Sequence, residues 1–393
     1  MKALSHIKHI IQVIWIYKIE IILEKFFYLF LKNKPLKNII IIESHNDFDC
    51  NGGAFYEYLL KHRYNQKYKI VWLIRKKIPH KLPDNVTTVP LYGPSFKKAY
   101  YMNRFKYMTY DSECGRKMRN DQIVAYCSHG AGGLKAVKGK QYVPESTNYI
   151  LTLSPKYTPI QAEQWSLDKN DPRFISIGYP SQDLLFKKSN ELQKITKKKY
   201  DKVLLWMPTF RKGIAYNRND STKEQPFGLP LIQTLDDYSK INELLKKHNS
   251  LLIIKIHPKQ DLKSLTLPDA SNIRILTGDK VKELNIDNYR LMPCVDALIS
   301  DYSGAAYDYL QLDRPIAYVL DDMDSYKNGF VVQDIHSLIA GQEVYNINDL
   351  EKFINDVANN QDPYKNKRRK IRNYIHEYHD QNASKRLAKL LKI

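Results

Sequence analysis

The feature that most constrains the fold is a repeated alternation of short apolar runs with amphipathic stretches, from residue 38 to residue 319. Several of the apolar runs are continuous, as in strands of a parallel sheet that is covered on both faces. This pattern predicts an α/β protein. The expected strands fall into two successive series, 38–42, 69–74, 107–110, 123–127, 149–153 and 174–177, then 203–206, 250–256, 272–276, 297–300 and 315–319.

At 393 residues the chain is long for a single hydrophobic core, so we expect two domains. Two α/β series joined by a Lys-rich segment predict two Rossmann-like domains that face each other across a cleft, with ligands at the carboxyl ends of the strands. The expected boundaries are 35–186 and 203–362 for the domains, 187–202 for the linker and 363–393 for a basic C-terminal helix.

The segment 1–34 contains an apolar stretch that four charged side chains interrupt: Lys18, Glu20, Glu24 and Lys25. These charges argue against a membrane-spanning helix, and no signal-peptide cleavage site is evident. Two interpretations stay open. The segment is either an amphipathic helix on an anionic membrane surface, or a helix packed on the protein's own core or on a partner subunit.

The net charge of +20 predicts an anionic partner. The basic residues are spread along the chain without a nucleic-acid-binding motif, so we expect a phosphate-rich substrate or an anionic membrane surface and no nucleic acid. The four cysteines are widely separated and form neither a zinc-binding nor a disulfide pattern, which favours a reduced, cytoplasmic setting.

Polar clusters follow five of the expected strands, and two of these clusters lie in the first half, at 43–46 (ESHN) and 128–135 (SHGAGGLK). His129 precedes a glycine-rich turn, where the backbone can approach a ligand closely. An imidazole at this place can act as a general base for a hydroxyl. The alternative is a histidine held in a hydrogen-bonded loop.

The other three clusters lie in the second half and carry groups that bind phosphate. Arg211 follows a strand and offers a planar guanidinium. Lys255 and His257 alternate with an apolar residue, so both should point to the same side of their strand.

In the third of these clusters a strand gives way to a helical pattern at Ser300, Asp301 and Ser303, where free N–H groups favour an anion. Ordinary helix capping is the alternative there.

Asp47 and Asp49 form a D-x-D pattern of the kind that holds a divalent cation with a sugar nucleotide. Since the other clusters already neutralise phosphate, we expect no metal.

Taken in order, the clusters resemble the motifs of the CDP-glycerol glycerophosphotransferase family, the teichoic-acid primases and polymerases, over residues 40–334. The segments at 299–308 and 322–330 are the most specific. The resemblance is carried by ESHN at 43–46, AFYEYLL at 54–60, SHG and LK within 128–135, GYP and Asp183 within 178–183, MPTFR at 207–211, IHP at 256–258, ISDYSGAAYD at 299–308, and DMDSY and GF within 322–330.

The resemblance implies a GT-B fold and transfer of glycerol phosphate from CDP-glycerol to a hydroxyl, with release of CMP and no required cofactor. It implies that His129 is the base that deprotonates the acceptor, with Glu43 as a second catalytic residue. The residues implied on the donor-phosphate side are His257, Arg211, Ser300, Asp301, Ser303 and Lys255, and those on the acceptor side are Asn46, Gly130 and Lys135.

Some positions depart from the family pattern, which leaves the alditol open: CDP-ribitol is the alternative donor. The departures are His45 for an aromatic residue, Asp47 for a glycine, a turn after His129 that is one residue longer, Ser181 and Gln182 for Arg-Asn, and Gly304 for a serine. They also leave open the identity of the acceptor.

We therefore expect a peripheral enzyme at the cytoplasmic face of the cell membrane that moves an alditol phosphate onto a lipid-linked or polymeric glycan, in teichoic acid or capsule synthesis. Primase and polymerase activity are both compatible with the sequence, and so is a homo-oligomer. Two rivals remain. One is another GT-B nucleotide-sugar enzyme, and the other is a non-catalytic phosphopolymer-binding module that does not need His129.

Overall fold

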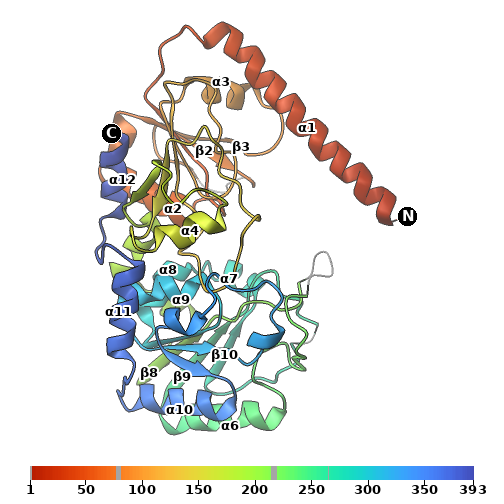
Figure 1. Ribbon diagram of the computed structural model, residues 1–393, viewed down its shortest axis with the longest axis vertical. Coiled ribbons are helices and arrows are strands. Elements are labelled where there is room, and N and C mark those ends of the chain that lie inside the picture. Colours follow the sequence, from red (N-terminus) through yellow and green to blue (C-terminus); the bar gives the residue numbers. More distant parts are fainter. Residues whose placement is uncertain (1, 77–80, 214–218, 264) are drawn as a thin grey trace.

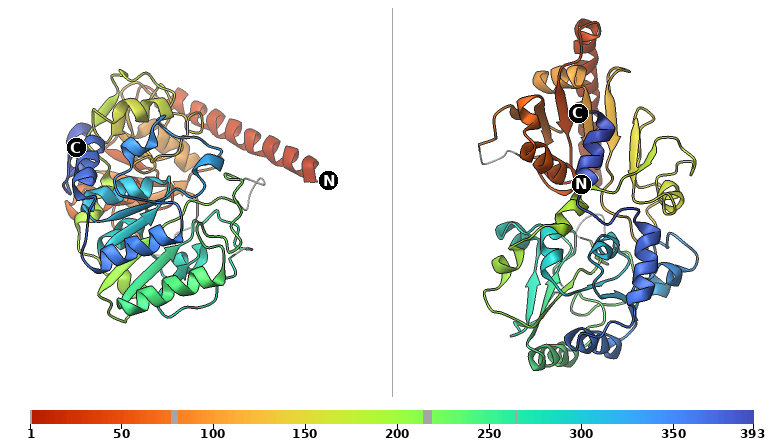
Figure 2. Two further views of the ribbon diagram at one scale, coloured as in Figure 1. Left: turned by 60° about the horizontal axis from the view of Figure 1, so that its bottom comes forward. Right: turned by 90° about the vertical axis from the view of Figure 1, so that its left-hand side faces the viewer.

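The computed structural model describes residues 2–76, 81–213, 219–263 and 265–393, with the side chains of the first helix described from Trp15 onward (Figure 1). The chain forms two α/β domains, one above the other in the view of Figure 1, and the further views of Figure 2 show the same division. This arrangement confirms the predicted pair of Rossmann-like domains.

The first domain is built on a seven-stranded sheet whose neighbouring strands all run parallel, in the order β3-β2-β1-β4-β5-β6-β7. The order reverses between β1 and β4, and such a switch point opens a crevice for ligands at the strand ends. The strands are β1 (Ile39–Ile42), β2 (Lys69–Ile74), β3 (Val86–Pro90), β4 (Tyr107–Tyr110), β5 (Ile123–Tyr126), β6 (Tyr149–Thr152) and β7 (Phe174–Ser176).

The second domain has a six-stranded parallel sheet in the order β10-β9-β8-β11-β12-β13, with its switch point between β8 and β11. Its central strands are buried along their length, as the continuous apolar runs predicted. The strands are β8 (Lys202–Trp206), β9 (Ser250–Lys255), β10 (Ile273–Leu276), β11 (Ala297–Ser300), β12 (Ile316–Val319) and β13 (Gln342–Val344).

Helices cover the sheets, and those nearest the domain boundary are α2 and α4 above it and α8 and α9 below it (Figure 1). Most begin at an oxygen-bearing cap: Thr234 and Asp237, for example, form a reciprocal capping box at the start of α6. The helices of the two domains are α2 (Cys50–Lys61), α3 (Phe96–Arg104), α4 (Thr158–Gln164), α6 (Leu235–Lys247), α7 (Gly278–Glu283), α8 (Asn288–Leu291), α9 (Gly304–Tyr309) and α10 (Ile347–Ala358).

The connection between the domains and the C-terminal segment differ from the prediction. The expected linker 187–202 contains the short helix α5 (Glu191–Ile195). The expected single basic helix at 363–393 is two helices, α11 (Lys365–Ile375) and α12 (Ala383–Leu391). The second returns to the first domain (Figure 1), where the Asp183 carboxylate accepts hydrogen bonds from the first backbone N–H groups of α12.

The N-terminal helix α1 (Lys2–Leu31) packs on α3, and its first part extends away from the domain (Figures 1 and 2). Glu20 and Glu24 are buried against the protein, where they form ion pairs with Lys98 and Arg116. The described large apolar side chains that are exposed on α1 are Trp15, Ile16, Tyr17, Ile19, Ile22, Phe26, Leu29 and Phe30.

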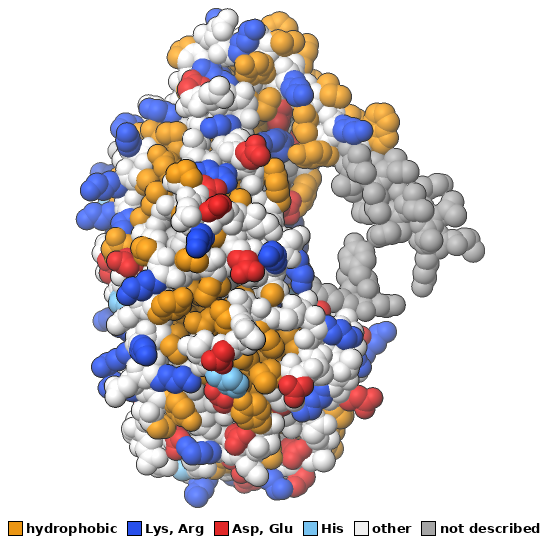
Figure 3. Space-filling model, in the orientation of Figure 1, with side chains coloured by type: hydrophobic (Ala, Val, Ile, Leu, Met, Phe, Trp, Pro, Cys, Tyr) orange, Lys and Arg blue, Asp and Glu red, His pale blue; other side chains and the backbone are white. Residues whose placement is uncertain are grey.

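The prediction that α1 is an amphipathic helix is therefore modified. Two of its four interrupting charges face the protein, while Lys18 and Lys25 stay exposed among the apolar side chains. Figure 3 shows orange side chains along the upper part of this helix. Within the part of the chain that the structure describes, no helix combines the length and the apolar character needed to cross a bilayer.

Candidate active site

A cavity of about 570 Å³ lies between the two domains. Its walls include the loops that follow β1 and β5 in the first domain and β8, β9 and β11 in the second, so both switch points open onto it. Seven of the predicted site residues line the cavity: His129, Asn46, Gly130, Lys135, Lys255, His257 and Ser303. Four others, Glu43, Arg211, Ser300 and Asp301, do not.

His129 stands on the loop after β5, and its side chain opens into the cavity. The loop turns sharply because Ser128, Gly130 and Gly132 all have positive φ angles. The side-chain amide of Asn51 donates hydrogen bonds of 2.9 and 3.0 Å to the carbonyl groups of Cys127 and Ser128, which fixes the start of the loop.

Desolvation of the His129 ring, aided by nearby basic groups, keeps its imidazole neutral. Burial is the largest cause of a lowered pKa, and His45, Lys135, Lys259 and His257 add to it, so that the pKa of His129 falls to about 3. A neutral imidazole is the form that can accept a proton from a hydroxyl. The geometry therefore suits the predicted base, because the ring is both accessible and unprotonated near neutral pH.

Glu43 has a supporting position outside the cavity lining, and its catalytic role stays a prediction. Its buried carboxylate accepts hydrogen bonds from the backbone N–H groups of Asp111, Ser112 and Glu113, at 3.0 to 3.2 Å, and pairs with the Arg75 guanidinium at 2.9 Å. Through these contacts Glu43 links the end of β1 to the segment that follows β4.

The two aspartates of the D-x-D pattern are also occupied by backbone groups. The Asp47 carboxylate accepts from the backbone N–H groups of Arg75 and Lys76, at 2.9 to 3.0 Å. The Asp49 carboxylate caps α2 by accepting from Cys50 N–H at 2.6 Å. Among the described residues, no group of three or more His, Cys, Asp and Glu side chains is arranged to hold a metal ion.

On the side of the second domain, two lysines and a histidine face the cavity. Lys255 ends β9 and is buried, which lowers its pKa. The ring of His257 lies 4.8 Å from that of Phe210, and its Nδ1 accepts from Lys259 N–H at 3.1 Å. Lys255, His257 and Lys259 thus line one wall of the cavity, opposite the loop of His129.

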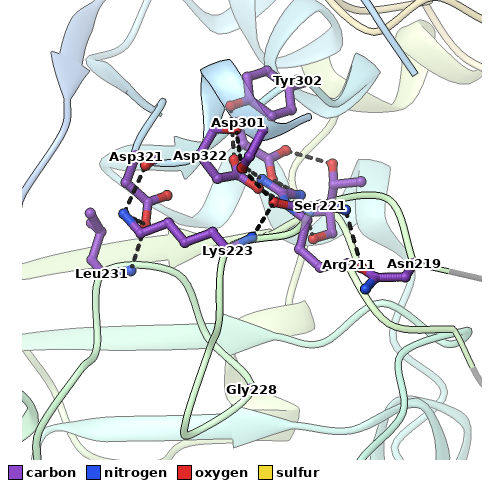
Figure 4. A network of polar contacts seen from close by, with 12 residues as sticks. Arg211, Asn219, Ser221, Lys223, Gly228, Leu231, Asp301, Tyr302, Asp321 and Asp322 are labelled. Carbon is purple, nitrogen blue, oxygen red and sulfur yellow. Dashed lines mark hydrogen bonds and ion pairs between the residues drawn. The ribbon is translucent and has the colours of Figure 1, made fainter. Parts of the chain in front are cut away.

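Arg211 lies in a buried ion network (Figure 4), and its contact with donor phosphate stays a prediction. Its guanidinium binds Asp322 at 2.6 and 3.0 Å, Asp301 at 3.0 Å and the Thr209 carbonyl at 2.8 Å. The ring of Tyr302 stacks beside it at 5.2 Å. With two carboxylates as partners, Arg211 braces the loop after β8 against the turn after β11.

The turn after β11 supplies one residue to the cavity. Ser303 caps α9 by accepting from Ala305 N–H at 3.3 Å, so the capping alternative holds for this serine, which also lines the cavity. Ser300 is buried and donates to the Met207 carbonyl at 3.5 Å. Asp301 accepts from the N–H and hydroxyl of Thr209. Ser300 and Asp301 thus make contacts inside the turn, and their contact with the donor phosphate stays a prediction.

One residue without an assigned role, Asp308, bridges the domains at the floor of the cavity. Its carboxylate accepts 2.8 and 3.0 Å hydrogen bonds from Gln182 of the first domain and Tyr289 of the second. Burial raises the pKa of Asp308 to about 6, which these hydrogen bonds oppose. Asp308 could have been singled out from the sequence, because it ends the specific segment 299–308. The sequence did not show that Gln182 would be its hydrogen-bond partner.

Comparisons with known proteins agree with this geometry. The family described as CDP-glycerol:poly(glycerophosphate) glycerophosphotransferase matches residues 25–392. The teichoic acid poly(glycerol phosphate) polymerase of Bacillus spizizenii is 25% identical over 324 residues, which cover 74% of this chain and 76% of that protein. The teichoic acid glycerol-phosphate transferase of Staphylococcus aureus is 25% identical over 366 residues, with coverage of 84% and 87%.

The fold has a counterpart among solved structures. The wall teichoic acid polymerase TagF superposes with a TM-score of 0.71 at 17% identity, over 100% of this chain and 96% of that one. Two facing Rossmann-like domains of the GT-B type are thus established for this protein. Since the family match extends over almost the whole chain, from the last turns of α1 to the end of α12, the chain belongs to the CDP-glycerol:poly(glycerophosphate) glycerophosphotransferase family.

Proposed function

We propose that the cavity binds CDP-glycerol against the second domain and that His129 deprotonates the hydroxyl of a teichoic-acid-type acceptor. The observation that carries the proposal is the placement of a neutral imidazole in one cavity with Lys255, Lys259 and the ring of His257. Phosphoryl transfer depends on positioning and on stabilisation of charge more than on covalent chemistry. Both requirements are met by groups that face each other across the domain boundary.

In the proposed reaction, Lys255, His257 and Lys259 face the diphosphate of the donor. The acceptor oxygen attacks the phosphorus that carries glycerol, while His129 takes the hydroxyl proton. The new bond joins the acceptor oxygen to this phosphorus, and the bond from the phosphorus to the bridging oxygen breaks, so that CMP leaves with that oxygen. The cations stabilise the charge that develops on the leaving phosphate.

Donor binding should also activate the base. Lys135, Lys259 and His257 contribute to the low pKa of His129. A bound diphosphate brings negative charge close to the same groups, which raises the pKa of the imidazole. The ring then becomes a stronger proton acceptor when the donor is in place. In this order the imidazole takes the proton of the acceptor hydroxyl and does not take one from solvent before the donor binds.

The test is CMP release from CDP-glycerol and, in parallel, CDP-ribitol, with a membrane-derived polymer acceptor. We expect release from one donor, and we expect His129→Ala to lower the rate by about 10²- to 10⁴-fold while donor affinity is retained. CMP release at the native rate by His129→Ala would overturn the assignment of the base. A folded protein that releases CMP from neither donor would overturn the assignment of the substrate.

For location, we propose that α1 lies on the cytoplasmic surface of the membrane, where a lipid-linked acceptor would be found. The exposed apolar side chains of α1 support this, because an apolar helix face with interspersed lysines suits the boundary of an anionic bilayer. The helix is fixed to the first domain through Glu20 and Glu24, so insertion of its apolar side would hold the domain at a set orientation.

Flotation with phosphatidylglycerol vesicles tests this location. The double variant Phe26→Ser/Phe30→Ser should lose most of its vesicle binding, whereas Leu235→Ser, an exposed apolar residue at the start of α6 in the second domain, should bind like the native chain. Equal binding of all three proteins would contradict the proposal. Equal binding to neutral and anionic vesicles would remove the contribution of the lysines.

A further inference from the structure

Two imidazole rings stack at the mouth of the cavity. The ring centroids of His45 and His129 are 3.7 Å apart, and the ring planes differ by 25°. His45 comes from the loop after β1, and His129 from the loop after β5, with β4 between these strands in the sheet. Each loop must therefore reach over the end of β4 to bring the rings into contact, which makes the stack a feature of the folded sheet rather than of local sequence.

Both loops are firmly held. The Arg75 guanidinium donates to the carbonyl of Ser44 at 2.5 Å and pairs with Glu43, which fixes the backbone on one side of His45. On the other side, the side chain of Asn46 donates to Asp49 at 3.4 Å. Asn51 holds the loop of His129, as described above. These contacts fix the backbone on both sides of the stack.

The usual orienting group of a catalytic histidine is a carboxylate or carbonyl that is hydrogen-bonded to one ring nitrogen. Among the described residues, no carboxylate lies within hydrogen-bonding distance of the His129 ring. A stacked ring provides a different constraint. It covers one face of the imidazole and leaves the edge, where both nitrogens lie, available to the acceptor and to solvent.

We propose that His45 is a positioning residue for His129, holding the plane of the imidazole by stacking so that a ring nitrogen meets the acceptor hydroxyl. The inference rests on the proposed role of His129 as the base. It also assigns a purpose to one departure from the family pattern, since histidine at this position keeps a flat ring where the family has an aromatic residue.

The second effect of His45 is electrostatic. Charged and titratable groups surround the pair on every side: Lys135 from the loop after β5, His257 and Lys259 from the loop after β9, and Glu43, Asp49 and Arg75 beside His45. Two stacked imidazoles repel each other when both are protonated, so a proton on His45 opposes a proton on His129. The pair therefore keeps His129 unprotonated to lower pH than one histidine alone would.

The test compares His45→Phe, which keeps the stack without the charge, with His45→Ala, which removes both. We expect His45→Phe to retain kcat within about threefold at pH 8 and to shift the acid limb of the kcat profile to higher pH. We expect His45→Ala to lower kcat on the order of 10-fold or more at every pH, because a base that is out of place loses much of its effect, while KM for CDP-glycerol stays unchanged.

The matched control is His62→Ala, which removes another histidine of the first domain that contacts a ring, 4.4 Å from that of Tyr58 and outside the cavity. Its kcat should equal that of the native chain. In the double variant His45→Ala/His129→Ala, the rate should equal that of His129→Ala alone, because His45 acts only through His129.

Three results would overturn the inference. The first is native kcat and a native pH profile in His45→Ala. The second is an equal loss in His45→Phe and His45→Ala, which would make the polar ring itself the essential group. The third is a raised donor KM with unchanged kcat. Native activity in His129→Ala would instead show that the proposed function has failed. If His45→Ala does not fold, the pH profile of His45→Phe still decides.

Discussion

The carbonyl oxygen of Gly132 occupies the space that a Cβ atom on Gly304 would need. The two glycines lie in different domains, and a Cβ on the adjacent Gly133 would meet the backbone of the 302–304 turn at 2.6 to 2.9 Å. Leu134 N–H also donates to the Tyr302 carbonyl at 3.1 Å. The lengthened turn after His129 and the replacement of a serine by Gly304 are therefore one adaptation. The longer turn fits only because residue 304 has no side chain.

Gly304→Ala should force the two domains apart at this contact. Because the obstructing atom belongs to the backbone, we expect a loss of about 1–3 kcal/mol in the free energy of unfolding and a lower kcat. Chemical denaturation measures the first and CMP release the second. Gly278→Ala is the control, since its Cβ would meet Pro258 at an ordinary distance of 3.4 Å. Equal stability of the two variants would contradict the close contact.

Arg211→Ala should destabilise the second domain by about 3–5 kcal/mol, because Asp301 and Asp322 would remain buried without a counter-charge. Arg211→Lys should recover only part of this loss, since an ammonium cannot bind both carboxylates in the same planar geometry. Urea unfolding followed by circular dichroism gives both values. A stable Arg211→Lys protein with much weaker donor binding would show that the guanidinium contacts phosphate after all.

Asp308 should make stability depend on pH in an unusual direction. Its pKa is raised to about 6 in the folded protein, so the folded state holds the proton more tightly than the unfolded state does. Its contribution is fully present below the unfolded pKa of about 4 and is lost as the pH rises through about 6, a change on the order of 3 kcal/mol.

Asp308→Asn removes this titration and serves as the reference. The urea midpoints of the native chain and of Asp308→Asn are measured at intervals from pH 4 to pH 7.5. As the pH rises, the midpoint of the native chain should fall relative to that of the variant. A difference that stays constant over this range would show that the carboxyl group is not perturbed.

Glu43→Gln should loosen the loop that carries His45. The amide keeps the size of the carboxylate but loses the ion pair with Arg75 and cannot accept all the backbone hydrogen bonds. We expect faster hydrogen exchange in 43–49 and a lower kcat with little change in donor KM. Unchanged exchange together with lost activity would return Glu43 to a direct part in catalysis.

Glu20→Gln/Glu24→Gln should release α1 from the first domain, because Lys98 and Arg116 would lose their counter-charges. Limited proteolysis should then cut faster near residues 32–38. Lys18→Gln/Lys25→Gln, which changes two exposed charges of the same helix, is the control and should be cut at the native rate. Equal cleavage of both variants would mean that the ion pairs do not hold the helix.

Much of the architecture could be predicted because buried parallel strands appear in the sequence as continuous apolar runs: β1 is four consecutive isoleucines, and β9 is apolar from Leu251 to Ile254. The two strands that were not predicted lack such a run. β3, with the sequence VTTVP, lies at an edge of its sheet and ends in proline, and β13 has three residues. Packing against a neighbouring strand decides their conformation, and that information is not local.

The place of the site in the fold could be predicted, but the side-chain contacts of its charged residues could not. Strand ends correctly placed His129, Lys255 and His257 around one cavity. Sequence alone does not show which side chains a charged group contacts, and this is why the ion pairs of Glu43 and Arg211 were not predicted. Their partners, such as Asp322, lie far away along the chain and are brought close only by the sheet.

The return of α12 to the first domain means that the chain passes between the domains twice, once near η2 (Pro180–Phe186) and once at 376–382. Gln311 joins the two passages, since its side-chain amide donates to the Tyr378 carbonyl at 2.9 Å and reaches Gln182 at 3.5 Å. Two adjacent covalent connections permit rotation of one domain relative to the other about a single axis, but they oppose twisting and sliding. Any closure of the cleft should therefore return Lys255, His257 and Lys259 to the same place relative to His129.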